Sequence, residues 1–222
     1  MSSAKQPTKS FTSGLDHVQD WFTKNHWETF TFQEECWESV LNGKEGILHA
    51  PTGSGKTLAL WMPHIIRWLD AKKQANKGLQ LIWITPLRAL AKDTERQFKQ
   101  SLAEFGLDIQ VGRRTGDVSS SVRKKQEQSM PQVLITTPES LHVLMAQKKH
   151  ERYFKHLHSV VVDEWHELMG SKRGTQTELF LARARALRPE VKTWGISATL
   201  GNMEEAAEVL MGTEKRYQDS FT

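Results

Sequence analysis

The stretch Ala50-Pro51-Thr52-Gly53-Ser54-Gly55-Lys56-Thr57 decides the fold of this chain. Before it lies a short apolar run, 46–50, which predicts a strand, and after it the apolar spacing of 57–70 predicts a helix. A glycine-rich turn between a strand and a helix is the context in which a chain binds phosphate. An ordinary Gly/Ser turn is the plainer alternative, and the flanking elements argue against it.

The residues of this loop suit the phosphates of a nucleotide. Gly53 and Gly55 allow successive backbone N–H groups to turn inward around an anion, and the N-terminus of the following helix attracts the same charge. Lys56 is expected to reach the β and γ phosphates, and Thr57 to bind Mg²⁺. The predicted nucleotide contacts in the loop are Thr52, Gly53, Ser54, Gly55, Lys56 and Thr57.

Strands and helices are expected to alternate along the rest of the chain. Aromatic residues spaced through 15–40 predict helices that pack on the edge of the domain. Such alternation implies right-handed crossovers and a mostly parallel sheet with helices on both faces, an α/β fold that binds ligands at the carboxyl ends of its strands. Further strands are predicted at 79–85, 109–112, 133–136, 159–163 and 192–196, and helices at 88–105, 139–147, 175–187 and 203–211.

Length and composition set the broad class. The chain has 222 residues, of which 38% are hydrophobic and 25% charged, so it can form one large domain with a real core. Its net charge of +4 is too small to identify a partner. Residues 1–14 are rich in Ser, Thr and Lys, which predicts a flexible tail before a domain at 15–222.

Cysteine usage and hydropathy indicate the compartment. Cys36 is the only cysteine, which excludes an intrachain disulfide and a multi-cysteine metal site. A reducing, cytoplasmic location is therefore predicted. No stretch approaches the roughly 20 apolar residues that span a bilayer, so no membrane role is expected.

Two adjacent carboxylates end a buried strand in Val160-Val161-Val162-Asp163-Glu164. An Asp-Glu pair alone is common at helix starts, but here the strand aims both acids at the crevice that Lys56 faces. Phosphoryl transfer needs one group that holds the metal ion and another that orients the attacking nucleophile. We expect Asp163 to hold Mg²⁺ through a water, and Glu164 to orient and deprotonate the attacking water.

With both motifs in view, nearly the whole chain resembles the first RecA-like domain of the superfamily 2 DExH-box helicases, a P-loop NTPase fold. The resemblance implies ATP hydrolysis coupled to movement on single-stranded nucleic acid. Gln33, in Phe30-Thr31-Phe32-Gln33, is similar to the glutamine that reads adenine, although a plain surface glutamine is the alternative. His166 ends the acidic box and is, with Lys56, Asp163 and Glu164, one of the catalytic residues that the resemblance implies. Ser197-Ala198-Thr199 resembles the motif that couples the ATP site to nucleic acid through Ser197 and Thr199.

Three further motifs resemble those that hold the phosphates of the bound strand. They are 85–90, 114–117 and 136–140, each at a junction that exposes backbone N–H groups, and Arg88 adds charge. Each could also be a plain turn. The polar, basic segment 113–130 is expected to be solvated, with phosphate contact as the alternative. The predicted nucleic-acid contacts are Pro86, Arg88, Thr115, Gly116, Thr137 and Pro138.

Within the superfamily, Asp163-Glu164-Trp165-His166 departs from the Asp-Glu-Ala-Asp box of RNA helicases. Lys172-Arg173-Gly174 resembles the large helicase-related (Lhr) type, and the bacterial ligase-associated DNA helicases are the nearest candidates. Trp165 is bulkier than the residue usual at its position. Because the acidic box departs from that of the RNA helicases and the nearest candidates are DNA helicases, DNA is favoured over RNA as the partner.

The family's second RecA-like domain supplies arginines that stabilise the transferring phosphate, and no residue after Thr199 resembles its motifs. An arginine of this kind is worth roughly 10³ to 10⁵ in turnover. We therefore expect this chain to be a fragment of a longer enzyme, one that binds nucleotide weakly and barely hydrolyses it alone. An RNA helicase domain and a non-unwinding nucleotide-binding module remain the alternatives.

Overall fold

A parallel sheet forms the centre of the molecule. The structure is a computed structural model that describes residues 13–71, 78–148, 150–199, 201–212 and 220–221. Seven strands lie in the order β3-β4-β2-β5-β6-β1-β7, and every pairing between them is parallel. Their bounds are β1 Gly46–His49, β2 Leu81–Ile84, β3 Val111–Arg114, β4 Val133–Thr136, β5 Ser159–Val162, β6 Lys192–Ser197 and β7 Ser220–Phe221.

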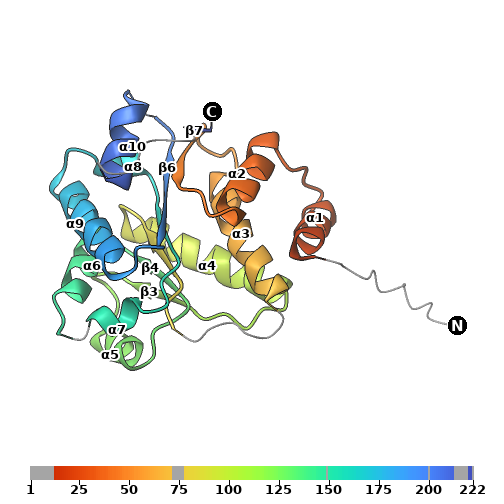
Figure 1. Ribbon diagram of the computed structural model, residues 1–222. Coiled ribbons are helices and arrows are strands. Elements are labelled where there is room, and N and C mark those ends of the chain that lie inside the picture. The colour runs from red at the N-terminus through yellow and green to blue at the C-terminus, as the bar shows by residue number, and fades with distance from the viewer. Residues whose placement is uncertain (1–12, 72–77, 149, 200, 213–219, 222) are drawn as a thin grey trace, which may run out of the picture.

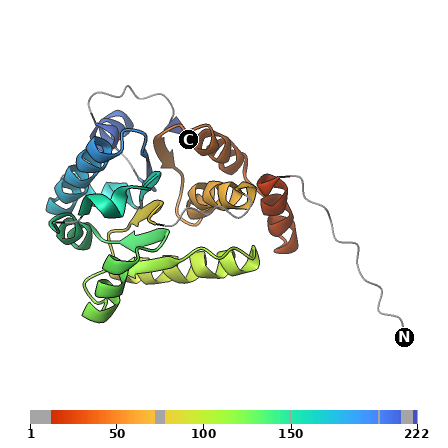
Figure 2. The ribbon, with the colours of Figure 1, turned by 60° about the horizontal axis from the view of Figure 1, so that its bottom comes forward.

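Helices cover both faces of this sheet, which confirms the predicted α/β architecture (Figures 1 and 2). The bounds are α1 Gly14–Lys24, α2 Thr31–Leu41, α3 Lys56–Asp70, α4 Arg88–Glu104, α5 Ser120–Gln128, α6 Pro138–Met145, α7 His150–Phe154, α8 Trp165–Leu168, α9 Lys172–Leu187 and α10 Met203–Met211. None of these described helices has both the length and the apolar character that crossing a membrane requires.

Side chains of the central strands point alternately to the two faces of the sheet, and each face carries its own hydrophobic core. In β2, Trp83 points to the face covered by α1 to α4, whereas Ile82 and Ile84 point to the face covered by α6 to α10. Strands buried on both faces read as continuous apolar runs, and Val160, Val161 and Val162 of β5 are fully buried in this way. Both cores pack against the strands whose carboxyl ends carry the motifs.

Several predicted boundaries differ from the structure by a few residues, and three of them have a clear physical cause. Strand β3 lies at Val111–Arg114 rather than 109–112, because the apolar side chain of Ile109 is buried ahead of the first paired residue. Ser13 and Gly14 of the expected tail cap and begin α1, and residues 1–12 lie outside the described part. Helix α9 begins at Lys172 rather than 175, since the Ser171 hydroxyl accepts a hydrogen bond from the Gly174 N–H.

The prediction of a solvated segment at 113–130 is wrong for part of that segment. Arg114 is only 3% exposed, and residues Ser120–Gln128 form α5. The Arg114 guanidinium pairs with Glu127 at 2.7 Å and donates to the Arg123 carbonyl at 3.2 Å. A buried arginine with these partners fastens the polar helix to β3, although the helix itself has little apolar surface.

The start of α9 provides a test of the packing. A Cβ added at Gly174 would lie 2.2 Å from the Leu168 carbonyl oxygen, so backbone must move to admit it. We expect Gly174→Ala to lower stability by about 1 to 3 kcal/mol, which corresponds to roughly 2 to 4 °C in melting temperature per kcal/mol. The control is Gly201→Ala, because nothing lies within 4 Å of a Cβ there. Equal melting temperatures for both variants would contradict this account.

Candidate nucleotide and nucleic-acid sites

Strand order brings the nucleotide motifs to one edge of the sheet. Strand β6 lies between β1 and β5, with His49 opposite Ser197 and Val162 opposite Gly195. The glycine-rich loop follows β1, the acidic pair follows β5 and the Ser-Ala-Thr segment follows β6. Because the strands are parallel, all three segments leave the sheet at the same edge.

The glycine-rich loop has the backbone that a phosphate cradle needs. Gly53 and Gly55 have φ angles of +79° and +87°, a region that other residues rarely adopt. Lys56 begins α3, and its ammonium donates to the carbonyl oxygens of Ala50 and Pro51 at 2.5 and 2.7 Å. The lysine thus lies folded over the loop, and phosphate oxygens could replace these carbonyls as its acceptors.

Gln33 makes two hydrogen bonds within the protein. Its Oε1 accepts from the Phe30 N–H at 3.0 Å, and its Nε2 donates to the Gly55 carbonyl at 3.1 Å. A Cβ at Gly55 would lie 2.6 Å from this Nε2. The side chain therefore braces the loop from α2, a contact that sequence reasoning did not predict. Its role toward adenine stays a prediction.

The acidic pair and Lys56 influence one another electrostatically. Burial, followed by the negative charge of Glu164, raises the pKa of Asp163 to about 6. Burial lowers the pKa of Lys56, while the charges of Glu164 and Asp163 raise it. Asp163 accepts hydrogen bonds from the Glu164 N–H at 3.0 Å and the Trp83 indole at 3.4 Å. These three charged groups therefore lie close enough to affect one another electrostatically.

Glu164 occupies a strained backbone position. Its φ and ψ are both 48°, in the left-handed region, and it caps the short helix α8. A side chain there costs of order 1 to 3 kcal/mol, and such strain clusters at functional sites. The turn also directs His166 toward β6, with its Nδ1 3.5 Å from the Glu164 carboxylate and 3.0 Å from the Ser197 hydroxyl. Ser197 donates in turn to the Thr199 carbonyl at 3.0 Å.

The chemistry of the donor set fits Mg²⁺. Thr57 and Asp163 offer hard oxygen atoms, and Asp163 is a poorly neutralised carboxylate that a cation would stabilise. No group of three or more His, Cys, Asp or Glu residues suited to a metal ion occurs within the described residues. Mg²⁺ commonly uses one or two carboxylates together with phosphates and waters, so this small donor set suffices.

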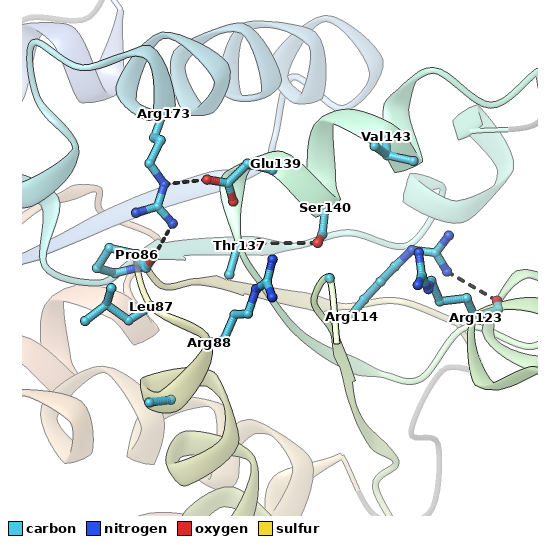
Figure 3. Close-up of a pocket in the computed structure, with 12 residues that line it drawn as sticks. Pro86, Leu87, Arg88, Arg114, Arg123, Thr137, Glu139, Ser140, Val143 and Arg173 are labelled. Atoms are coloured by element: carbon cyan, nitrogen blue, oxygen red, sulfur yellow. Dashed lines mark hydrogen bonds and ion pairs between the residues drawn. The ribbon is translucent and has the colours of Figure 1, made fainter. Parts of the chain in front are cut away.

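A second site lies beside the first, over the other half of the sheet. A cavity of about 630 Å³ opens where β2, β3 and β4 pass into their following helices (Figure 3). Of the predicted nucleic-acid contacts, Pro86, Arg88, Gly116 and Thr137 line it. We call this cavity the groove.

Two predicted contacts do not line the groove. Thr115 is completely buried, and its hydroxyl donates to Asp117 at 2.5 Å and accepts from Arg113. Pro138 is buried as the first residue of α6. Both residues lie inside the junctions between strand and helix, and neighbouring residues form the surface of the groove.

Three arginines outside the list of predicted contacts also line the groove: Arg114 and Arg123, from the basic segment for which phosphate contact was the alternative, and Arg173. Arg123 donates to the Val118 carbonyl at 2.9 Å, and Arg173 pairs with Glu139 at 2.5 Å. Arg88 is exposed, and in the described part of the chain no hydrogen bond or ion pair engages it. The basic composition of 113–130 was the only local signal for Arg123, and the packing of α5 on β3 brings this residue to the groove.

Removing the charge of Asp163 should stabilise the protein in metal-free buffer. Its pKa in the folded state is raised from 3.8 to about 6, so ionisation costs stability as the pH rises from 4 through 6. Asp163→Asn should gain about 1 to 2 kcal/mol at pH 8 and lose that gain near pH 4. Urea unfolding in EDTA at both pH values measures this. Asp93→Asn, at an exposed site on α4, is the control, and a destabilised Asp163→Asn at pH 8 would refute the expectation.

Comparison with known proteins gives a consistent result. The profile of the DEAD/DEAH box helicase family matches residues 30–207. The Lhr helicase/probable uracil glycosylase of Mycolicibacterium smegmatis is 35% identical over 206 residues, covering 88% of this chain and 14% of that protein. The ATP-dependent helicase Lhr-Core of Sulfolobus acidocaldarius is 34% identical over 212 residues, covering 90% of this chain and 24% of that protein.

A solved structure extends the likeness to three dimensions. The structure of Mycobacterium smegmatis helicase Lhr bound to ssDNA and AMP-PNP matches with a TM-score of 0.76 at 33% identity, covering 90% of this chain and 27% of that one. The chain therefore spans about a quarter or less of the length of these relatives. The predicted RecA-like fold and the resemblance to Lhr-type helicases are confirmed. This chain belongs to the DEAD/DEAH box helicase family.

Proposed function

We propose that this chain is the ATP-binding domain of an ATP-dependent helicase or translocase that moves on single-stranded nucleic acid. One observation carries the proposal: the charge of Glu164 acts on both Lys56 and Asp163 at the edge of the sheet where the groove also opens. A nucleotide site and a nucleic-acid groove on adjoining strands suit coupling between hydrolysis and movement.

Each residue of the nucleotide site has a distinct role in this proposal. Lys56 and the loop N–H groups bind the phosphates, and Gln33 keeps the loop in shape while contacting the base. Thr57 and Asp163 would hold Mg²⁺, which neutralises charge on the phosphates when bound. Glu164 orients the attacking water and accepts its proton, as its position beside His166 allows.

The contact between His166 and Ser197 supports a route to the nucleic acid. Ser197 ends β6 and also bonds to the Thr199 carbonyl, so a shift of the acidic box would reach the segment after β6. Such a route requires an element with two arrangements. We infer that a second RecA-like domain, for which the greater length of the relatives leaves room, completes the site with arginines and takes part in this movement.

DNA is the preferred partner in this proposal. The Lhr structure most useful for comparison holds ssDNA, and the groove contacts suit a phosphate backbone without reading bases. The alternative, an RNA helicase domain, is tested by competition between DNA and RNA strands of equal length at a stated salt concentration. The lone Cys36 and a nucleic-acid substrate also support a cytoplasmic location.

Lys56→Ala should abolish detectable nucleotide binding, because the variant loses the cation that faces the phosphates. Titration with a fluorescent ATP analogue measures this. Lys99→Ala, on the exposed side of α4, removes a lysine charge elsewhere and serves as the control. Undiminished affinity in Lys56→Ala would mean that the loop does not bind the phosphates.

In the full-length enzyme, Glu164→Gln should bind ATP normally and lose turnover by a factor on the order of 10² to 10⁴, the usual contribution of a general base. Steady-state ATPase assays and ATP titration separate the two effects. Glu167→Gln, one turn further along and exposed, is the matched control. Turnover at the wild-type rate in Glu164→Gln would remove Glu164 from the base role.

Arg88→Ala tests the groove. It should weaken binding to all single-stranded sequences alike and reduce the slope of log K against log salt by about 0.7, the value for one phosphate contact on a single strand. Fluorescence anisotropy over a salt series measures the slope. The control is Arg96→Ala, on the same helix and highly exposed. A loss that depends on sequence would argue against a backbone contact.

A further inference from the structure

Arg173 connects two of the junctions that form the groove. It is the second residue of α9, and Figure 3 shows its guanidinium between Glu139 and Pro86. Its Nε donates to a Glu139 carboxylate oxygen at 2.5 Å, and its Nη2 donates to the Pro86 carbonyl. One planar cation therefore holds acceptors from two separate segments in fixed relative positions.

The two segments held by Arg173 are the ones expected to touch the strand. Pro86 leads from β2 into α4, where Arg88 begins the helix. Glu139 lies in the first turn of α6, two residues after Thr137 and close to the end of β4. Strands β2 and β4 are neighbours, so the distance between these helix N-termini sets the spacing of two possible phosphate contacts.

Arg173 differs from Arg88 in its exposure and in its hydrogen-bond acceptors. Arg88 has no protein acceptor in the described residues, and its guanidinium lies so close over Gly116 that an added Cβ there would be 2.6 Å from Nη2. The Arg173 side chain is 35% exposed and has its acceptors within the protein. Arg88 is thus available for an incoming phosphate, whereas Arg173 is engaged by the walls of the groove.

We propose that Arg173 is a positioning residue for nucleic acid, which clasps the Pro86 turn to the start of α6 and so fixes the spacing of the phosphate contacts. The inference rests on the proposed function of the groove. It differs from two simpler roles for the same side chain: direct contact with a phosphate, and an exposed ion pair with no effect on binding.

The test uses the full chain and a labelled single-stranded oligonucleotide of mixed sequence, with affinity measured by fluorescence anisotropy over a salt series. The variants are Arg173→Ala, Arg173→Lys and Glu139→Ala, with Arg88→Ala as the reference for a phosphate contact. We expect Arg173→Ala to weaken binding roughly threefold to tenfold, allowing for exposure of the pair. The salt slope should remain that of the wild type, because no phosphate contact is lost.

The conservative and the partner variants separate the three roles. Lysine keeps the positive charge but lacks the planar guanidinium that donates to two acceptors at once. Arg173→Lys should therefore bind as weakly as Arg173→Ala if Arg173 is a clasp. Glu139→Ala removes a negative charge from the groove, which by itself would strengthen binding. The clasp predicts weaker binding instead, and losses in the Arg173→Ala/Glu139→Ala double variant that are less than additive.

Each contrary result overturns a defined statement. A reduced salt slope in Arg173→Ala, with recovery in Arg173→Lys, would make Arg173 a phosphate contact. Wild-type affinity in Arg173→Ala, or tighter binding by Glu139→Ala, would leave the pair without a positioning role. If Arg88→Ala binds as the wild type does, the proposed function of the groove fails and the clasp fails with it. Circular dichroism of Glu139→Ala, changed at a half-exposed position, shows whether the fold is intact.

Discussion

The candidate nucleotide site depends on the electrostatic interaction of one lysine ammonium with two carboxylates. Burial disfavours the charged form of Lys56 and of Asp163, and their mutual attraction only partly offsets that cost. Glu164 adds a second negative charge and raises the pKa of Asp163 further. A cation and a polyphosphate bound together would relieve both effects.

This arrangement exists because the sheet is parallel. Loops that are more than 100 residues apart in the chain, after β1 and β5, leave the sheet at the same edge with β6 between them. The groove uses the remaining strands, β2, β3 and β4, at the same edge. Trp83 links the two halves, since it belongs to β2 while its indole donates to Asp163 of the nucleotide site.

Local chemistry explains why the strand-loop-helix around Lys56 and the strand that ends before Asp163 could be predicted. Gly53 and Gly55 are needed for positive φ angles, and a run of valines ending in Asp163 and Glu164 indicates a buried strand followed by a turn. Such features act over a few residues, so their spacing in the chain reports their structure. The resemblance to helicases then supplied roles, such as that of Gln33, that no local argument could supply.

The groove was predicted less completely, for a physical reason. Arg114 lies in a polar segment without an apolar stripe, which indicated solvent exposure, yet Glu127 and a backbone carbonyl accept its hydrogen bonds in the interior. Thr115 belongs to a motif that suggested contact, but Asp117 and Arg113 engage its hydroxyl. Side-chain pairing decides burial for these polar residues, and hydropathy periodicity does not record it.

The sequence by itself determined the α/β class, the strand-loop-helix around Lys56 and the identity of the acidic pair, because these follow from short-range backbone and hydropathy rules. Only the tertiary structure decided that Gln33 braces the loop, that His166 meets Ser197, and that Arg173 joins two junctions. Each of those contacts joins separate elements. Their geometry depends on strand order and helix packing, which emerge only when the whole chain has folded.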